Sequence, residues 1–286
     1  MLWSIIHRPV LLLAVMILCG CQSTAKPQDA DPRSTIPLDH LPALDGDYFK
    51  FESRAVGRSF HIYVRLPDGY DGRASSEYPV IYVLDGDSLF PILAANHLFL
   101  NYDVDLPKAI IVGVAYGSFD PVTNKRGFDF SAPAADATIE QGGAREFLSF
   151  LESELLPEVE RRYRADPSRR VLFGQSRSGY MVLYSAFVAP DLFWGRIASN
   201  PAFDPGRELF FSAPAQSSRT DLGLVVTSGS RDIPALREAA LDWFEVWKDR
   251  DDAPWEIKTA TIDGGTHAAN SSDSYRLGMV WLFNDE

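Results

Sequence analysis

The residues with the clearest chemical potential form a Gly/Ser-rich run, Gly174-Gln-Ser-Arg-Ser-Gly179. This run follows a short apolar segment, Val171–Phe173, that is typical of a strand, and it precedes Tyr180–Val188, which is typical of a helix. A sharp strand-to-helix turn exposes its central serine as a nucleophile for acyl transfer. The same composition also suits a turn without catalytic function, so the choice depends on the partners that the rest of the chain supplies.

Two serines compete for the centre of this turn, and steric crowding decides between them. The residues two before and two after the nucleophile must be small. Around Ser176 these residues are Gly174 and Ser178, whereas around Ser178 they would be Ser176 and the bulky Tyr180. The sequence therefore predicts Ser176 as the nucleophile, with a serine in place of the second glycine of G-x-S-x-G.

A serine hydroxyl needs a base to take its proton, and the chain has only five histidines. His7 and His40 precede the predicted folded part, and His61 lies in an apolar segment that resembles an edge strand. His97 lies in a predicted helix and is the main rival. His267 follows the last predicted strand, and functional groups of α/β folds gather at the carboxyl ends of strands. We therefore predict His267 as the base.

An acid between Ser176 and His267 would complete the order Ser, acid, His. Asp232 lies just beyond the strand predicted before the last one. It would fix the tautomer of His267 and stabilise the imidazolium. Alternatively, Asp232 forms a turn or caps a helix. Glu238 or Asp242 would then be the acid, or serine and histidine would work alone.

The negative charge that develops on an attacked carbonyl oxygen requires backbone N–H donors. One predicted donor is the N–H of Arg177, directly after the nucleophile. The other is the N–H of Asp87, in the Asp-Gly-Asp-Ser segment that follows the apolar run Val80–Leu84. Asp-Gly is also a common turn pair, so a simple turn is the other interpretation of that segment.

These residues need a scaffold of strands and helices. Apolar runs bounded by Gly, Pro and Asp suit buried parallel strands. We predict such strands at Val80–Leu84, Ile110–Ala115, Val171–Phe173, Arg196–Ser199, Leu224–Ser228 and Ile257–Ile262, with an edge pair at Tyr48–Ala55 and Ser59–Leu66. Helical stretches alternate with them, which predicts an α/β fold with a mostly parallel sheet covered on both faces.

Three details of the helices and loops are also predicted. Apolar residues repeat every four positions from Phe147 to Val159, with Pro157 expected to kink or interrupt that helix. Pro234 opens a second helix and Ser271 caps the last. Residues 116–143 and 202–221 show no periodicity and are expected to form loops over a cleft.

The composition excludes several kinds of function. A formal net charge of −12 repels a phosphate backbone, so no nucleic-acid partner is expected. The two cysteines, Cys19 and Cys21, both lie near the N-terminus. Cysteine catalysis, cysteine-ligated zinc and internal disulfides are therefore excluded for the body of the chain, and no metal site is expected.

The N-terminus predicts export and a lipid anchor. A basic start precedes the apolar run Val10–Cys19, which is about half the length that spans a bilayer. Leu18-Cys-Gly-Cys21 resembles the lipobox of bacterial lipoproteins, which implies a signal peptide over residues 1–20 and a lipid on Cys21. A flexible tether over 21–46 and a folded domain over 47–286 follow.

Gln22 resembles the residue that directs Gram-negative lipoproteins to the outer membrane, here facing the periplasm. An ordinary secretory signal or an uncleaved anchor are the alternatives.

Four stretches resemble one family of hydrolases: residues 78–87, 155–163, 173–179 and 190–193. They are similar to the esterase D-like "putative esterase" family, which includes siderophore trilactone esterases and feruloyl or acetyl ester hydrolases, with mycolyltransferases as distant relatives. The resemblance implies an α/β-hydrolase fold without a cofactor over nearly the whole mature chain. It carries over Ser176 and His267, and Asp232 less directly, because the acid's position varies in such families.

The sequence departs from this family beside the nucleophile. The family usually has an aromatic or aliphatic residue at position 177 and glycine at 178, where this chain has Arg177 and Ser178. A guanidinium there would suit an acyl group that bears a carboxylate or phenolate. The sequence thus predicts a lipid-anchored hydrolase of small-molecule carboxylic esters, such as siderophore or aromatic acyl esters, that forms an acyl-enzyme. An acyltransferase with the same site and a non-catalytic envelope lipoprotein are the alternatives.

Overall fold

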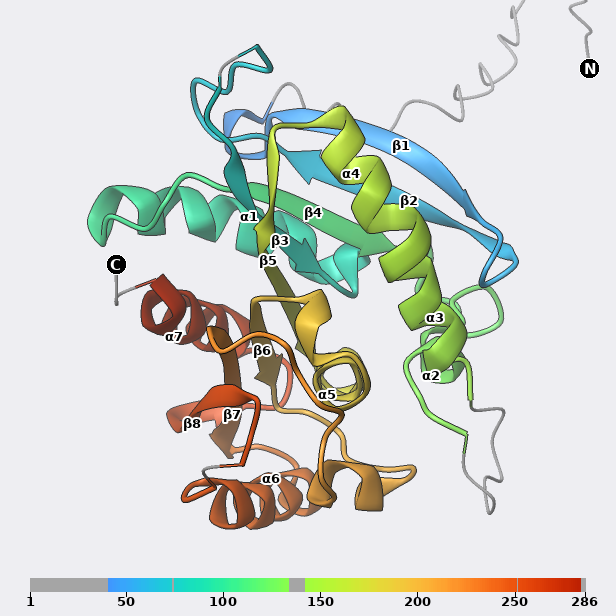
Figure 1. The fold of residues 1–286 in the computed structure, drawn as a ribbon, viewed down its shortest axis with the longest axis vertical. Helices are drawn as coiled ribbons and strands as arrows, with labels where there is room; N and C mark the ends of the chain where they lie inside the picture. The colour runs from blue at the N-terminus through green and yellow to red at the C-terminus, as the bar shows by residue number, and fades with distance from the viewer. Residues whose placement is uncertain (1–40, 74, 134–141, 251, 284–286) are drawn as a thin grey trace, which may run out of the picture. The chain divides into compact units, whose positions relative to one another are not determined.

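An eight-stranded sheet runs through the domain (Figure 1). The computed structural model describes residues 41–73, 75–133, 142–250 and 252–283. The spatial order is β1-β2-β4-β3-β5-β6-β7-β8, in which β1, β2 and β4 pair antiparallel and all later pairs are parallel. The strands are β1 (Gly46–Ser53), β2 (Arg58–Arg65), β3 (Tyr78–Val83), β4 (Ile110–Ala115), β5 (Ala165–Gln175), β6 (Gly195–Ser199), β7 (Leu222–Arg231) and β8 (Trp255–Thr266).

The central strands are buried on both faces, which explains their continuous apolar sequences. All six residues of β4 and all five of β6 are buried. Successive side chains of a strand point to opposite faces, so each strand contributes to two separate cores. The strand β2, between the edge strand β1 and β4, instead alternates over residues 60–64: Phe60, Ile62 and Val64 are buried, and the two residues between them are partly exposed. Its pattern therefore places one face on the core and the other toward solvent.

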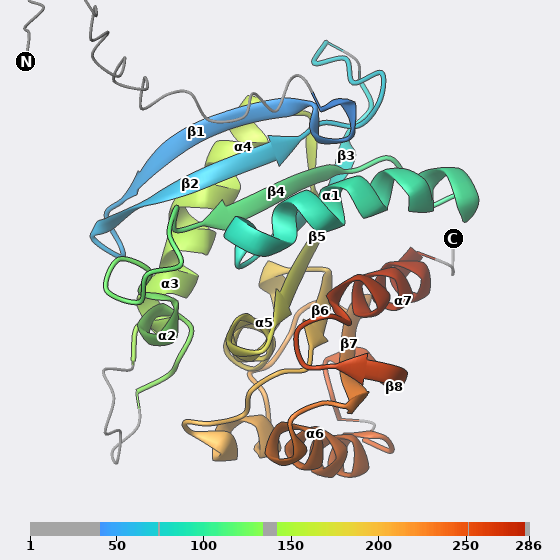
Figure 2. The same ribbon diagram turned by 180° about the vertical axis from the view of Figure 1, so that it is seen from behind.

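Helices cover both faces of the sheet (Figures 1 and 2). One face carries α1 (Gly86–Asp103) and α7 (Ser271–Phe283), and the other carries α4 (Leu156–Arg162), α5 (Arg177–Val188) and α6 (Pro234–Trp247). Shorter helices are α2 (Arg126–Asp129) and α3 (Ala144–Phe150), with 3₁₀ turns at Pro42–Leu44, Pro190–Leu192 and Arg207–Phe211. The sheet and its two helical layers confirm the predicted α/β class.

The helix expected to be interrupted by Pro157 is divided just before that residue. Between α3 and α4 lies one π-helical turn, Leu151–Leu155, and Pro157 falls in the first turn of α4. Proline has no N–H, and its ring clashes with the carbonyl four residues earlier, so the regular hydrogen-bond pattern cannot continue through it. Leu151 and Leu155 stay buried, and the wider turn keeps the apolar face on the core.

All eight predicted strands are present, and the differences lie at their ends. The strand predicted over Val171–Phe173 is much longer, because β5 starts at Ala165 with exposed polar residues that the apolar pattern does not detect. The predicted cap of α7 is wrong: Ser271 is the first helical residue, and its hydroxyl donates to the carbonyl of Ala268 at 3.2 Å. Ordered structure also begins before residue 47, because Leu44 is buried.

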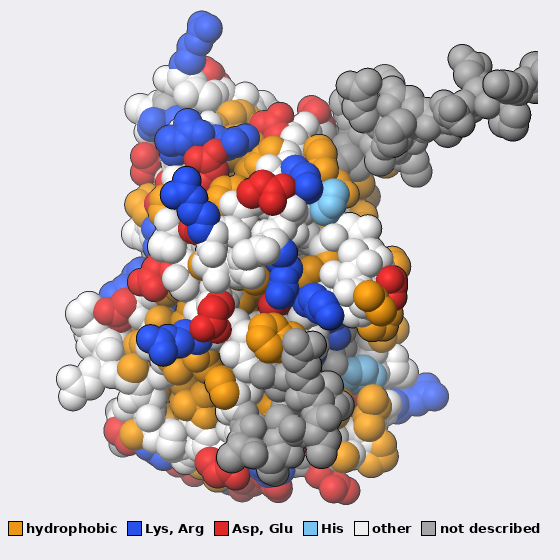
Figure 3. Space-filling model, turned by 90° about the vertical axis from the view of Figure 1, so that its right-hand side faces the viewer, with side chains coloured by type: hydrophobic (Ala, Val, Ile, Leu, Met, Phe, Trp, Pro, Cys, Tyr) orange, Lys and Arg blue, Asp and Glu red, His pale blue; other side chains and the backbone are white. Residues whose placement is uncertain are grey.

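The predicted signal peptide, Cys21 and the tether up to residue 40 lie outside the described residues. Within the described ranges, no helix combines the length and apolar character needed to cross a bilayer. On the face of the domain drawn in Figure 3, Lys and Arg side chains stand beside Asp and Glu side chains.

Candidate active site

Ser176 occupies a strained turn between β5 and α5. Its backbone has φ 60° and ψ −115°, a combination that ordinary residues adopt only where the surrounding structure enforces it. A Cβ at Gly174 would lie 2.4 Å from the carbonyl oxygen of Ser178, so the approach requires glycine. The turn therefore presents the Ser176 side chain at the carboxyl end of the sheet, as the steric argument from the sequence predicts.

Asp232 and His267 follow two neighbouring parallel strands, β7 and β8, at the same end of the sheet. His267 Nδ1 lies 2.7 Å from Asp232 Oδ1, and His267 Nε2 lies 2.9 Å from Ser176 Oγ. A buried carboxylate can only accept, so Nδ1 carries the imidazole proton and Nε2 is free to accept the Ser176 proton. The structure thus brings the three predicted residues into one hydrogen-bonded chain.

The loop that carries His267 is fixed by its main chain. The His267 carbonyl accepts hydrogen bonds from Gln175 Nε2 at 2.6 Å and from Asn200 Nδ2 at 2.7 Å. The Asn200 Oδ1 atom accepts from the N–H of Gly229 at 2.8 Å, which ties this loop to β7. Two amide side chains therefore hold the imidazole over Ser176. Sequence analysis misses both, because an amide of this kind has no local signature.

The two predicted oxyanion donors lie at helix starts. Arg177 is the first residue of α5, and Asp87 is in the first turn of α1, where backbone N–H groups have no acceptor within the helix. The Asp87 carboxylate accepts from the N–H groups of Tyr116 and Gly117 at 2.8 and 2.7 Å. Asp85 enters α1 with φ 54°, in the left-handed region. Both helix starts border the Ser176 side of the sheet.

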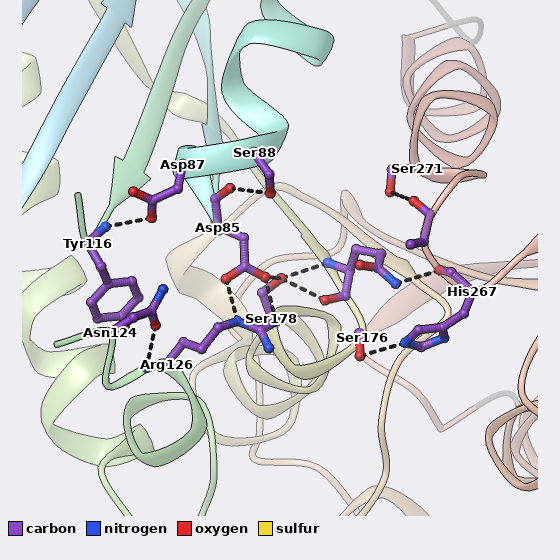
Figure 4. Close-up of polar contacts among 12 residues, drawn as sticks. Asp85, Asp87, Ser88, Tyr116, Asn124, Arg126, Ser176, Ser178, His267 and Ser271 are labelled. Atoms are coloured by element: carbon purple, nitrogen blue, oxygen red, sulfur yellow. Dashed lines mark hydrogen bonds and ion pairs between the residues drawn. The ribbon is translucent and has the colours of Figure 1, made fainter. Parts of the chain in front are cut away.

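A second network, centred on Asp85, connects the two helix starts (Figure 4). The Asp85 carboxylate accepts from Arg126 Nε and Nη2 at 2.7 and 2.6 Å, and from Ser178 Oγ at 2.7 Å. Ser178 Oγ also accepts from the N–H of Gln175 at 2.8 Å. The serine that replaces the family's glycine therefore links the nucleophile turn to the start of α1.

Ser176 and His267 open onto a cavity of about 330 Å³, whose walls include Asp85, Asp87, Phe119 and Arg126. Arg177, the cation expected at the substrate, is not among the lining residues. Its Nη1 donates to the Asp204 carbonyl, its guanidinium lies 5.8 Å from the Tyr180 ring, and burial lowers its pKa. Arg126, from a segment predicted only as a loop, is instead the cation that borders the cavity.

The alternative base His61 and the alternative acids Glu238 and Asp242 do not contact Ser176 or His267 in the structure. His61 Nδ1 lies 2.7 Å from the hydroxyl of Tyr48 on the edge strand β1, with which it forms a hydrogen bond. Glu238 is exposed on α6, and Asp242 pairs with Arg207 at 2.8 Å. Within the described ranges, no three His, Cys, Asp or Glu side chains form a group that could hold a metal ion.

His97, the other alternative base, is buried in the core, where it makes the stability of the protein depend on pH. It is 1% exposed, bonded to the Tyr275 hydroxyl at 3.0 Å and the Pro107 carbonyl at 3.1 Å, and burial lowers its pKa to about 4. The unfolded chain binds this proton near pH ~6.5. Stability should therefore fall by up to roughly 3 kcal/mol as pH drops from ~6.5 to about 4.

Urea titrations at pH 7 and pH 4.5 would test this expectation. The free energy of unfolding of His97→Gln should depend less on pH over this interval than that of the wild type, because the variant lacks the titrating group. Equal losses in both proteins would show that other groups cause the acid sensitivity.

The "Putative esterase" family model matches residues 53–281. The chain belongs to this family. A curated relative, the ferri-bacillibactin esterase BesA of Bacillus subtilis, is 33% identical over 163 residues, which are 52% of this chain and 56% of BesA. The apo-salmochelin esterase of Escherichia coli is 28% identical over 218 residues, 70% of this chain and 65% of that enzyme. The chain thus spans between half and two thirds of the length of the curated relatives that it matches.

Solved structures support the same fold. The BES protein from Bacillus cereus superposes with a TM-score of 0.72 at 24% identity, covering 82% of this chain and 94% of that one. The enterobactin and salmochelin hydrolase IroE gives 0.65 at 23% identity, covering 82% and 93%. At these identities the likeness shows the fold alone. It confirms an α/β-hydrolase fold for this family member.

Proposed function

We propose that this family member is a serine esterase that hydrolyses small-molecule carboxylic esters through an acyl-enzyme. The observation that supports this most directly is the chain of hydrogen bonds from Asp232 through His267 to Ser176, on a strained turn that opens into a cavity. A nucleophile, its base and an orienting carboxylate are the parts that this reaction needs.

The proposed reaction has two halves. As Ser176 Oγ bonds to the ester carbonyl carbon, its proton passes to His267 Nε2, and Asp232 stabilises the resulting imidazolium. The backbone N–H groups of Arg177 and Asp87 hold the oxyanion. The C–O bond to the alcohol then breaks, and the alcohol leaves with the proton from His267. A water molecule repeats the sequence on the acyl-enzyme, which releases the acid and restores Ser176.

The names of the curated relatives support a substrate class. The relatives are named as esterases of ferri-bacillibactin, triacetylfusarinine C and apo-salmochelin, which are siderophores. We propose a siderophore ester, or an ester with an aromatic acyl group, as the substrate. Labelling with a fluorophosphonate followed by a panel of p-nitrophenyl esters tests the activity. A protein that is neither labelled nor active on any ester would contradict the proposal and favour a non-catalytic role.

We further propose that the domain is anchored to the envelope through a lipid on Cys21. The support is the Leu18-Cys-Gly-Cys21 segment, which lies outside the described residues. In a Gram-negative host the protein should fractionate with the outer membrane, and Cys21→Ala should release it or block its processing. Mass spectrometry of the N-terminal peptide should find the lipid. Recovery of the wild type in the soluble periplasm without a lipid mass would contradict the anchor.

A further inference from the structure

A second cavity adjoins the one above Ser176. It also measures about 330 Å³, and its walls are mainly apolar: Leu44, Tyr63, Phe90, Pro91 and Phe119. The two cavities share Asp87 and Phe119, whereas Ser176 and His267 line only the first. The second cavity therefore neighbours the site across Asp87 and Phe119, on the side where Asp87 lies opposite His267 (Figure 4). Its size is at the lower end of the range that small ligands occupy.

The inner wall of this second cavity is rigid. The rings of Tyr63 and Phe90 stack with centroids 5.6 Å apart. Phe90 is 2% exposed and is pressed from behind by β4, where a Cβ at Gly113 would lie 2.6 Å from the Phe90 Cβ atom. The aromatic surface is thus held in place before any ligand arrives, which reduces the ordering cost of binding.

The outer wall is Phe119, which is 74% exposed. It belongs to a turn held by several hydrogen bonds: Asp120 N–H donates to Ser118 Oγ at 3.0 Å, and Asn124 Nδ2 donates to the Ser118 carbonyl at 2.8 Å. The Gly117 N–H then attaches the turn to Asp87. A large apolar side chain fixed between two cavities offers its surface to an apolar group of a ligand.

The carboxylates near this wall do not repel an uncharged ligand. Asp87 accepts two backbone N–H groups, and Asp85 is paired with Arg126. Both oxygens of each carboxylate therefore have donors of their own, and an apolar occupant would strip no donor from them. The second cavity suits a neutral ring better than a second charged group.

The chemistry of the site decides which part of an ester reaches this cavity. The leaving alcohol must take its proton from His267 Nε2, so it lies on the His267 side. The carbonyl oxygen faces the N–H groups of Arg177 and Asp87, which leaves the remaining direction, toward the cavity beside Phe119, for the acyl substituent. We propose that the second cavity binds an apolar, ring-sized group in the acyl part of the ester. This assignment rests on the proposed function and makes Phe119 and Pro91 specificity-determining residues.

Pro91→Trp tests the proposal by filling the cavity from its exposed edge. Ile92→Trp is the matched control, because it places the same side chain on the next residue of α1, 50% exposed and outside the cavity. Pro91→Trp should raise the KM for p-nitrophenyl benzoate roughly tenfold or more. The KM values for p-nitrophenyl acetate and 2-naphthyl acetate should rise by a much smaller factor, and Ile92→Trp should change the KM of none of the three esters.

A second variant covers the case in which Pro91→Trp does not fold. Phe119→Ala removes an exposed ring, and it should raise the KM for the benzoate by a clearly larger factor than the KM for p-nitrophenyl acetate. Equal effects on all esters, or a selective loss of 2-naphthyl acetate, would overturn the acyl assignment while the esterase activity stands. A wild type that hydrolyses none of the esters and carries no label on Ser176 would overturn the proposed function, and this assignment with it.

Discussion

Ser176→Ala should abolish fluorophosphonate labelling and lower kcat by roughly 10⁴-fold or more. The hydroxyl that His267 Nε2 approaches at 2.9 Å is the only part of the residue that this change removes. The substituted alanine keeps the same backbone constraints, so the free energy of unfolding should change little. Steady-state kinetics with p-nitrophenyl acetate would measure the loss in kcat, and intact-protein mass spectrometry would measure the loss of labelling.

Two nearby serines serve as controls. Ser88 lines the same cavity, but its hydroxyl donates to the Asp85 carbonyl at 3.3 Å, so Ser88→Ala should retain full labelling. Ser178→Ala should also retain the label, although its loss of the bond to Asp85 should slow turnover. A label that maps to Ser178, or activity that survives in Ser176→Ala, would show that the nucleophile is misassigned.

Asp232→Asn should lower kcat by up to ~10⁴-fold while the protein still folds. An asparagine amide can donate to His267 Nδ1, which would place the imidazole proton on Nε2, where it blocks acceptance from Ser176. His267→Ala should be about as damaging as Ser176→Ala, and the double variant should be no worse, because the residues act as one unit. Rates measured in all four proteins would show this lack of additivity.

Asp242→Asn is the matched control for the acid. Asp242 pairs with Arg207 on the surface of the domain, so its loss should leave kcat unchanged. If Asp232→Asn costs only a few-fold while Asp242→Asn or Glu238→Gln costs far more, the orienting acid is not Asp232. If none of these changes matters, Ser176 and His267 work as a dyad.

The steric argument for the nucleophile works from sequence because it concerns contacts within a single turn. The crowding at Gly174 arises from Ser178, four positions away, and any chain with this turn must satisfy it. The strands are also predictable, since burial on both faces leaves a continuous apolar run such as Ile110–Ala115. Polar strand ends such as that of β5 carry no comparable signal.

The network around Asp85 is not predictable in the same way. It joins a residue after β3, an arginine 41 positions later and a serine 93 positions away. Nothing in the local sequence of Arg126 marks it as a neighbour of the site, and the more conspicuous Arg177 turns to the Asp204 carbonyl instead. Only the tertiary arrangement of β3, α2 and α5 determines which of the two cations borders the cavity.

The turn that carries Phe119 has a consequence for how members of this family change over evolution or under engineering. Its internal hydrogen bonds run among residues 118–124, and it meets the catalytic framework through the Tyr116 and Gly117 N–H groups on Asp87. At this junction Gly117 has φ 78°, and a Cβ there would lie 2.5 Å from His61 Nε2, so position 117 requires glycine. The amide contacts to Asp87 impose no side-chain identity on residues 118–124 beyond it. A turn of different length or composition can therefore be exchanged as a module on the Asp87 carboxylate, and substrate range can diversify while Ser176, His267 and Asp232 remain untouched.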